Sequence, residues 1–214
     1  MYTSPKSHPI IRYQRVRELA YMTSDAELNR WNKRYMKEGR SRLGMPPRKI
    51  LLDWAHLLPE HGLALDAAAG VGANGIFLAE RGLSVIAMDI SEVALRLAVA
   101  QARSGTLPLQ AAVCDMALLQ LPGNSFDVIA NFFFLKRANL QVYRRALKEG
   151  GVLFFETLLN TDALAVIPKY YLERGELMRA FADFEILHRA EGVACGENRF
   201  SEQLIARKPP PVIF

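Results

Sequence analysis

One segment restricts the fold of this chain more than any other, the run LALDAAAGVGANGIFLAERG at residues 63–82. An apolar stretch ends at Asp66, small residues follow, and a helical pattern closes at Gly82. Residues 70–75 match G-x-G-x-x-G, a pattern of nucleotide-binding turns, and Asp89 lies 19 residues after Gly70. A strand, a glycine turn and a helix in this order predict the first unit of an open α/β sheet.

The same alternation of apolar runs and helical patterns continues along the chain. Further strands are predicted to end at Asp89 and Asp115 and to span Phe126–Phe134 and Gly151–Thr157. Their nearly continuous apolar character is typical of parallel strands that are covered on both faces. Two later runs, from Phe184 and Ser201, are too close in sequence for a crossover helix and predict an antiparallel pair at one end of the sheet. We therefore expect an α/β fold: a Rossmann-like, seven-stranded, mostly parallel sheet with one antiparallel strand and helices on both faces.

Helix boundaries are marked by capping residues. Ser91 is placed as the N-cap of a helix that stops at Gly105. Near the N-terminus, Ser24 and Glu27 form a capping-box pattern for a helix that ends at Gly39. We expect three parts: a basic helical arm or lid at 1–50, a body at 51–208, and a short tail at 209–214.

Composition narrows the class of protein. The chain has 214 residues, half of them apolar and 23% charged, as expected for one soluble globular domain. It has no run of eighteen apolar residues, and its two cysteines are 81 positions apart without nearby metal ligands, so we expect a cytoplasmic protein without a membrane span or a metal site. Residues 1–50 carry 12 basic and 4 acidic side chains, a surplus that serves solubility or attracts an anionic partner.

Three successive predicted strands end in an aspartate beside the glycine turn. Asp66 would repel a diphosphate and attract an ammonium group, Asp89 would accept hydrogen bonds from ribose hydroxyls, and Asp115 would accept one from an adenine amino group. Each aspartate could instead cap a helix or form a turn. Because ligands of open α/β sheets bind beyond the carboxyl ends of the strands, we expect the three carboxylates to converge on one crevice.

A ligand with an ammonium group, a ribose and an adenine is S-adenosylmethionine, and the chain resembles the class I S-adenosylmethionine-dependent methyltransferases. The segments that carry the resemblance are LDAAAGVGANG, VIAMDIS, AVCDMALLQLPGNSFDVIAN and LKEGGVLFFET. The resemblance implies S-adenosyl-L-methionine as cofactor and S-adenosyl-L-homocysteine as product. It implies a cofactor site made of Asp66, Ala67, Ala68, Gly70, Gly72, Asn74, Asp89, Ile90, Asp115, Met116 and Asn131, with Trp31 and Arg34 above it. Ala68 replaces the first glycine of the family's loop, so we expect a negative φ there.

A narrower resemblance is to the tellurite-resistance type of methyltransferase. It rests on WNKRYMKEG, NFFFLKRANL and YYLERGELMRAFADFEILHRAEG. It implies in-line methyl transfer to a small nucleophile: a chalcogen oxyanion such as tellurite or selenite, a thiol or another small metabolite. No catalytic residue is identified.

Some residues have two interpretations at this stage. Tyr35, Lys136 and Arg137 are candidates for binding the acceptor. The alternatives are that Tyr35, with Trp31, lies in an amphipathic helix that packs on the body, and that the two cations open a solvated helix. Glu156 either lines the acceptor pocket or caps the next segment.

Other functions remain open. Residues 131–134, Asn-Phe-Phe-Phe, stand where adenine amino-methyltransferases carry Asn-Pro-Pro-aromatic, but both prolines are missing, so a nucleic-acid substrate is disfavoured. A nicotinamide-dependent oxidoreductase fits the glycine pattern but conflicts with Asp66 and lacks a Tyr-x-x-x-Lys pair. A protein that binds S-adenosylmethionine without catalysis would share the same pocket residues. The oligomeric state is not predicted.

Overall fold

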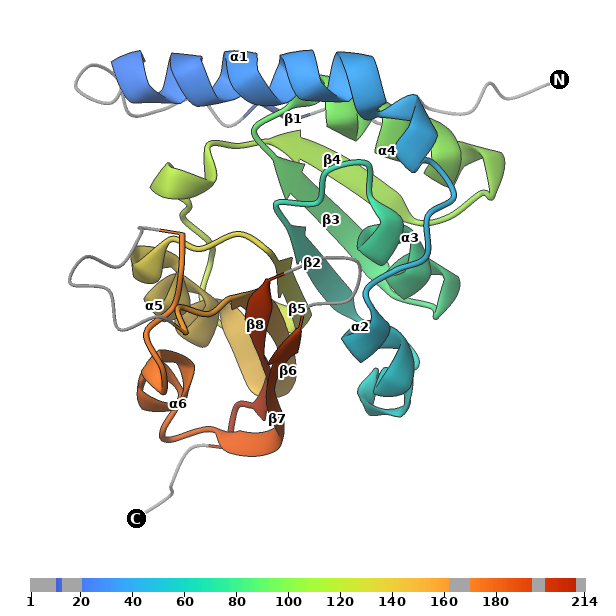
Figure 1. The fold of residues 1–214 in the computed structure, drawn as a ribbon. Helices are drawn as coiled ribbons and strands as arrows, with labels where there is room; N and C mark the ends of the chain where they lie inside the picture. Colours follow the sequence, from blue (N-terminus) through green and yellow to red (C-terminus); the bar gives the residue numbers. More distant parts are fainter. Residues whose placement is uncertain (1–10, 13–20, 162–169, 194–198, 211–214) are drawn as a thin grey trace, which may run out of the picture.

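The computed structural model describes residues 11–12, 21–161, 170–193 and 199–210 (Figure 1). Most of the predicted tail at 209–214 lies outside these ranges.

The described residues form one sheet in the strand order β1-β4-β3-β2-β5-β6-β8-β7. Among these strands, β8 runs in the direction opposite to all the others, and it is therefore antiparallel to its neighbours β6 and β7. This confirms the mostly parallel sheet with one antiparallel strand. The structure adds an eighth strand, β1, whose two residues are too few to give an alternating pattern in the sequence. The strands are β1 (Ile11–Arg12), β2 (Leu63–Ala67), β3 (Ser84–Asp89), β4 (Leu109–Val113), β5 (Phe126–Phe132), β6 (Leu147–Leu158), β7 (Glu185–Val193) and β8 (Phe200–Arg207).

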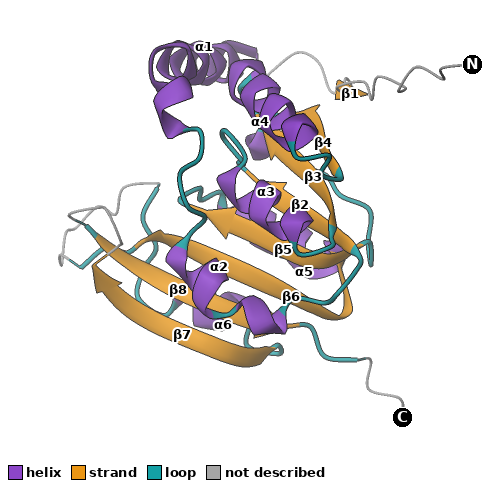
Figure 2. Cartoon of the chain, turned by 90° about the vertical axis from the view of Figure 1, so that its right-hand side faces the viewer, coloured by secondary structure: helices purple, strands orange, loops and turns teal. Residues whose placement is uncertain are grey.

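Helices cover both faces of this sheet, as predicted (Figure 2). One apolar cluster joins α2, α3 and α4 to one face, with Leu51, Phe77 and Leu95 among its buried residues. A second cluster joins α5 and α6 to the other face, with Tyr143 and Phe181 fully enclosed. The helices are α1 (Tyr21–Glu38), α2 (Lys49–Asp53), α3 (Ala73–Glu80), α4 (Glu92–Ser104), α5 (Arg137–Ala146) and α6 (Glu176–Ala180).

Capping residues set most of the predicted helix ends. The Ser91 hydroxyl accepts a hydrogen bond from the Ala94 N–H at 3.2 Å, and α4 ends just before Gly105. In contrast, α1 begins at Tyr21, three residues before the predicted cap at Ser24. A capping-box pattern marks a helix start only where the preceding backbone leaves the helix, and here residues 21–23 continue it. The predicted end at Gly39 is confirmed, because α1 ends at Glu38.

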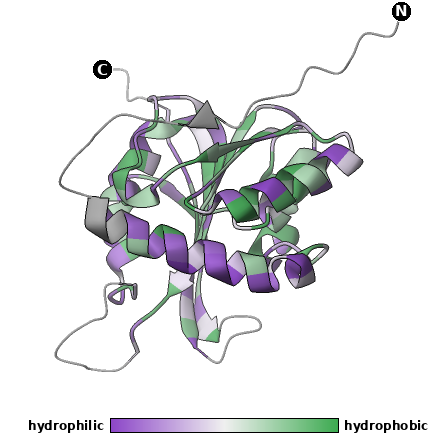
Figure 3. Ribbon diagram, turned by 90° about the horizontal axis from the view of Figure 1, so that it is seen from above, coloured by the Kyte–Doolittle hydropathy of each residue, from purple (hydrophilic) through white to green (hydrophobic). Residues whose placement is uncertain are grey.

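Helix α1 lies across the top of the molecule, above β4 and α4 (Figure 1). Its outward surface is mostly hydrophilic, whereas the central strands are mostly hydrophobic (Figure 3). A hydrogen bond from the Ser91 hydroxyl to the Asn32 side-chain oxygen, at 2.7 Å, ties α1 to the start of α4. The arm therefore packs beside the ends of the strands that carry the predicted aspartates.

Candidate active site

The carboxylate of Asp66 is enclosed beneath the glycine loop. Asp66 is the second-last residue of β2 and is 1% exposed, and its Oδ2 accepts a hydrogen bond from the Gly75 N–H at 2.8 Å. Burial raises the pKa of Asp66 to about 7, which the Gly75 hydrogen bond partly offsets and the charge of Asp89 reinforces. The carboxyl group thus links β2 to the first turn of α3 and lies under the loop.

Asp89, the last residue of β3, holds the other side of the loop. Its Oδ2 accepts from the Gly70 N–H and its Oδ1 from the Ser91 N–H, both at 2.8 Å. Burial raises the pKa of Asp89, and these backbone hydrogen bonds oppose the shift. Each carboxylate oxygen can still accept a second hydrogen bond. The structure thus brings Asp66 and Asp89 together on neighbouring strands.

The glycines of the loop are required by close approaches from three different elements. An added β-carbon at Gly70 would lie 2.6 Å from the Tyr35 hydroxyl oxygen, and one at Gly72 would lie 2.7 Å from the Ala98 β-carbon. At Gly75 it would lie 2.9 Å from Asp66 Oδ2. Gly70 and Gly72 also have positive φ values of 55° and 83°. Packing and backbone conformation together explain the pattern.

The expectation for Ala68 is wrong, because its φ is +54°. A left-handed conformation costs an L-residue about 1–2 kcal/mol. The turn nevertheless imposes it, since the next N–H, that of Ala69, donates to the Met88 carbonyl of β3 at 2.9 Å. Alanine has the smallest side chain of any residue other than glycine, so it brings the least bulk to this position.

Tyr35 of α1 reaches the glycine loop, where its hydroxyl group lies against Gly70. Burial, with a further contribution from Asp89, raises the pKa of Tyr35 to about 12. The Trp31 ring stacks on Tyr35 with centroids 5.9 Å apart, and the Arg34 guanidinium lies 5.3 Å from the Trp31 ring centroid while it pairs with Glu38. An amphipathic helix that packs on the body and a lid above a ligand would both make these contacts, so the contacts are consistent with both interpretations.

Asp115 lies two residues beyond β4, so the predicted strand end is displaced there. Its carboxylate accepts from the Ala117 N–H at 2.8 Å and caps a short 3-10 helix, Met116–Leu118. Met116 is 3% exposed and its side chain belongs to the core. Ile90 is half-buried between Asp89 and the α4 cap. Ala67 is buried in the same core.

Two asparagines of the predicted site make internal contacts. Asn131 is fully buried, donates to the Phe134 carbonyl at 2.8 Å and accepts from the Tyr143 hydroxyl at 3.0 Å. Its side chain is therefore enclosed in the fold and does not present itself to a ligand. Asn74 accepts a hydrogen bond from the Arg48 N–H at 2.9 Å and so anchors the segment that leads from the arm.

Of the two cations after β5, Arg137 lies toward α6. Arg137 pairs with Glu176 at 2.6 Å and donates to the Tyr171 carbonyl at 3.0 Å, which ties α5 to the chain before α6. Lys136 directly precedes α5 and is exposed.

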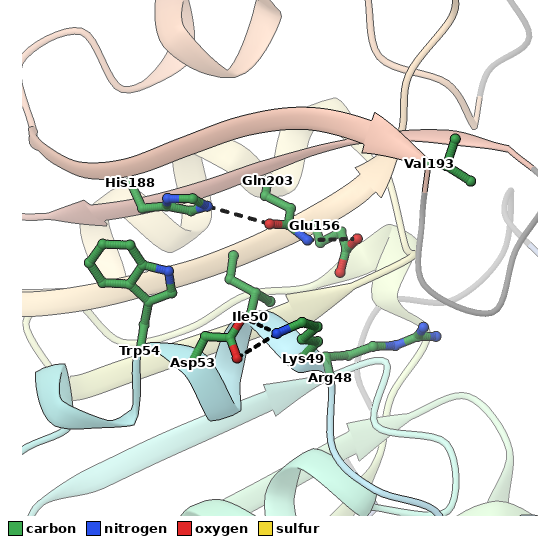
Figure 4. A pocket seen from close by; sticks show the side chains of 9 residues that line it. All are labelled: Arg48, Lys49, Ile50, Asp53, Trp54, Glu156, His188, Val193 and Gln203. Carbon is green, nitrogen blue, oxygen red and sulfur yellow. Dashed lines mark hydrogen bonds and ion pairs between the residues drawn. The ribbon is translucent and has the colours of Figure 1, made fainter.

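A cavity of about 230 Å³ lies between α2 and the strands β6, β7 and β8 (Figure 4). Arg48, Lys49 and Trp54 line it from the side of α2, and Glu156 and Gln203 line it from the strands. Of these residues, sequence reasoning singled out only Glu156. The others come from segments without a shared motif, so no pattern in the sequence indicated that they meet.

The described residues contain no group of three or more histidine, cysteine, aspartate or glutamate side chains placed to hold a metal ion. Within the same ranges, no helix combines the length and apolar character of a membrane span.

Residues 64–151, which carry the glycine loop and all three aspartates, match the model of a family described as a methyltransferase domain. These residues are thus similar to a methyltransferase domain, and the match covers less than half of the chain. A putative methyltransferase of Bacillus subtilis, YqeM, is 31% identical over 120 residues, which are 52% of this chain and 48% of YqeM. The chain thus spans about half the length of this curated relative.

Solved structures share the fold of the methyltransferase domain and its flanking segments. TehB from Haemophilus influenzae is 19% identical with a TM-score of 0.65, covering 83% of this chain and 67% of TehB. An S-adenosylmethionine-dependent methyltransferase from Methanosarcina mazei is 22% identical with a TM-score of 0.62, covering 78% and 100%. Geranyl diphosphate C-methyltransferase from Streptomyces coelicolor, solved with S-adenosyl-L-homocysteine, is 14% identical with a TM-score of 0.64, covering 88% and 98%.

The cavity lies outside the residues matched to the methyltransferase domain. Arg48 and α2 precede residue 64, and Glu156, β7 and β8 follow residue 151. The methyltransferase domain therefore contributes the glycine loop, while the flanking segments build the cavity wall.

Proposed function

We propose that the chain is an S-adenosylmethionine-dependent methyltransferase that transfers a methyl group to a small-molecule nucleophile. The observation that carries the proposal is the convergence of the buried carboxylates of Asp66 and Asp89 on a glycine loop at the carboxyl ends of neighbouring strands. The division into an arm at 1–50, a body at 51–208 and a tail at 209–214 is part of the proposal.

The carboxylates and aromatic rings around the glycine loop fit this cofactor. Asp89 has acceptor capacity left on both carboxylate oxygens, which suits the two hydroxyls of a ribose. The ionised form of Asp66, under the loop, favours an ammonium group and disfavours a diphosphate. Asp115, next to Met116 and two residues beyond β4, is the candidate for the adenine amino group. Trp31 and Tyr35 present aromatic faces that attract a sulfonium by cation–π interaction.

S-adenosylmethionine supplies a methyl group that is already activated on a sulfonium. The protein has to bind and orient the nucleophile and to exclude water. Tyr35 serves the exclusion of water, because it packs against Gly70 and covers that side of the site, and Trp31 stacks on Tyr35. The acceptor classes we consider are a chalcogen oxyanion such as tellurite or selenite, a thiol, and another small metabolite. Fold similarity to TehB, a tellurite-resistance methyltransferase, supports including the first.

Calorimetry tests the cofactor assignment. We expect S-adenosyl-L-homocysteine to bind the wild type, and Asp89→Ala to weaken this binding about tenfold or more, because two hydroxyl donors lose a charged acceptor. Asp183→Ala is the matched control, since Asp183 pairs with Arg144 on the protein surface. Equal affinity in the wild type and Asp89→Ala would contradict the role of Asp89. Preference for a nicotinamide dinucleotide would contradict the function.

A screen with labelled methyl donor tests the acceptor classes. Tellurite, selenite, thiols and small organic acids are offered separately as acceptors, and RNA and DNA fragments are offered in parallel. The label incorporated into each acceptor is measured. Transfer to a small acceptor supports the proposal. Transfer confined to nucleic acid would replace it, and tight cofactor binding without transfer to any acceptor would indicate a non-catalytic binding protein.

A further inference from the structure

The cavity between α2 and the strands contains a carboxylate oxygen that has no donor among the described residues. Glu156, near the end of β6, is 3% exposed. The Ser201 hydroxyl, at 2.9 Å, and the Gln203 amide, at 3.1 Å, both donate to its Oε1. Within the described ranges of the chain, no side chain or backbone group donates to Oε2. A buried carboxylate with one oxygen bonded and the other available is suited to a ligand that donates a hydrogen bond.

Arg48 brings to the same cavity a positive charge without an ion-pair partner among the described residues. Its guanidinium lies 4.2 Å from the centroid of the Phe133 ring, and no carboxylate of the residues that the structure describes lies within ion-pair distance of it. The neighbouring Lys49 differs, because its ammonium contacts both carboxylate oxygens of Asp53, at 2.6 and 2.8 Å. Arg48 is therefore the cation that the cavity offers to a ligand.

Neutral groups hold the carboxylate in place and close the cavity. The Gln203 side-chain oxygen lies 3.4 Å from His188 Nε2, which directs the amide nitrogen of Gln203 toward Glu156. The Trp54 ring lies 4.8 Å from the His188 ring, centroid to centroid, and forms an apolar wall (Figure 4). The Glu156 carboxylate and the Arg48 guanidinium thus border a cavity that has hydrogen-bonded polar side chains on one side and an apolar wall on another.

The cavity adjoins the glycine loop. The Arg48 N–H donates to Asn74, at the start of α3, and the Phe133 N–H after β5 donates to the Glu156 carbonyl at 2.7 Å. β5 is the strand next to β2, which leads into the loop. A ligand in the cavity would lie beside the proposed cofactor site.

We propose that this cavity binds the methyl acceptor and that the acceptor is a small zwitterion. Its anionic group pairs with Arg48 and its ammonium group donates to Glu156 Oε2. A purely anionic ligand meets repulsion from Glu156, and a purely cationic one meets repulsion from Arg48. The volume of about 230 Å³ is below the ~300 Å³ at which pockets for drug-sized ligands begin. The proposal rests on the methyltransferase function proposed above.

Binding of three matched probes, followed by NMR titration of the full chain, tests the inference. L-alanine carries both charges, propionate carries the negative one and n-propylamine the positive one. We expect L-alanine to bind at least about tenfold more tightly than either single-charge probe. Arg48→Met and Glu156→Gln should each weaken L-alanine binding about tenfold. Arg96→Met, which removes a cation that pairs with Glu92 on α4 and does not line the cavity, should leave it unchanged.

Calorimetry with S-adenosyl-L-homocysteine on the same samples separates the two proposals. If the wild type and Arg48→Met bind this product equally while L-alanine binds no tighter than propionate, the zwitterion assignment is overturned and the methyltransferase function stands. An equal loss of L-alanine binding in Arg96→Met would also overturn it. If the wild type does not bind the product, the proposed function fails and the acceptor assignment fails with it. Thermal melting of each variant verifies that it is folded.

Discussion

The glycine loop and the cavity beside α2 use their polar groups in opposite ways. In the loop, the carboxylates of Asp66 and Asp89 accept hydrogen bonds from the protein backbone. In the cavity, the Arg48 guanidinium has no ion-pair partner and Glu156 Oε2 has no donor among the described residues. Polar groups that hold the backbone contribute to folding, whereas polar groups left available contribute to ligand binding. Substitutions in the loop should therefore lower stability more than substitutions in the cavity.

Gly72→Ala should give the largest effect. The new β-carbon would lie 2.7 Å from that of Ala98, and φ at Gly72 is +83°. Overpacking and left-handed strain together should lower the free energy of unfolding by about 3 kcal/mol. Gly44→Ala is the matched control, because Gly44 has φ +72° and no atom within 4 Å of an added β-carbon. Chemical denaturation measures both, and equal losses would contradict the packing argument.

Asp66→Asn should change how stability depends on pH. In the unfolded chain Asp66 titrates near its ordinary pKa of 3.8, and burial raises this pKa to about 7 in the folded protein. Between these values the folded protein holds a proton that the unfolded chain has lost. The stabilisation that this proton gives the folded protein is fully present below about pH 4 and is lost as the pH rises toward 7. The free energy of unfolding then falls by at most about 1.4 kcal/mol per pH unit.

Asparagine does not titrate, and its oxygen can still accept from the Gly75 N–H. Asp66→Asn should therefore gain stability relative to the wild type as the pH rises from 4 to 7. Urea denaturation at a series of pH values measures the difference. Parallel profiles for the two proteins would show that Asp66 is ionised in the folded state throughout this range.

Ser91→Ala should cost about 1 kcal/mol, because α4 loses its N-cap. The same change removes the hydrogen bond to Asn32, so amide hydrogen exchange in α1 should become faster. Asn32→Ala breaks the tie to α1 and keeps the cap. If Asn32→Ala lowers stability as much as Ser91→Ala does, the cap is not the main contribution of Ser91.

Arg48→Met should have the smallest effect on folding, at most about 1 kcal/mol, since the described contacts of the guanidinium reduce to the Phe133 ring. The backbone hydrogen bond to Asn74 remains. A loss as large as that of Gly72→Ala, measured by the same denaturation, would remove the contrast between the loop and the cavity.

Much of the sheet could be predicted from sequence because strand and helix patterns are local. Apolar runs and the Ser91 cap depend on neighbours a few residues away, and both were confirmed. Asn131 shows the limit of this reasoning. Its place after a strand is consistent with a ligand contact, but its bonds to Phe134 and Tyr143 enclose it. Whether a polar residue at a strand end faces a ligand or the core depends on what packs against it.

The sequence by itself determined the strand–loop–helix unit, the glycine pattern and the aspartates near the ends of β2 and β3. Only the tertiary structure decided that Ala68 takes a positive φ, that Tyr35 reaches Gly70 and that Arg48 shares a cavity with Glu156. The physical reason is the order of the strands. β6 and β8 lie side by side although more than forty residues separate them. α2 packs on the face of the sheet to which both strands contribute buried residues, so residues with no common motif meet there.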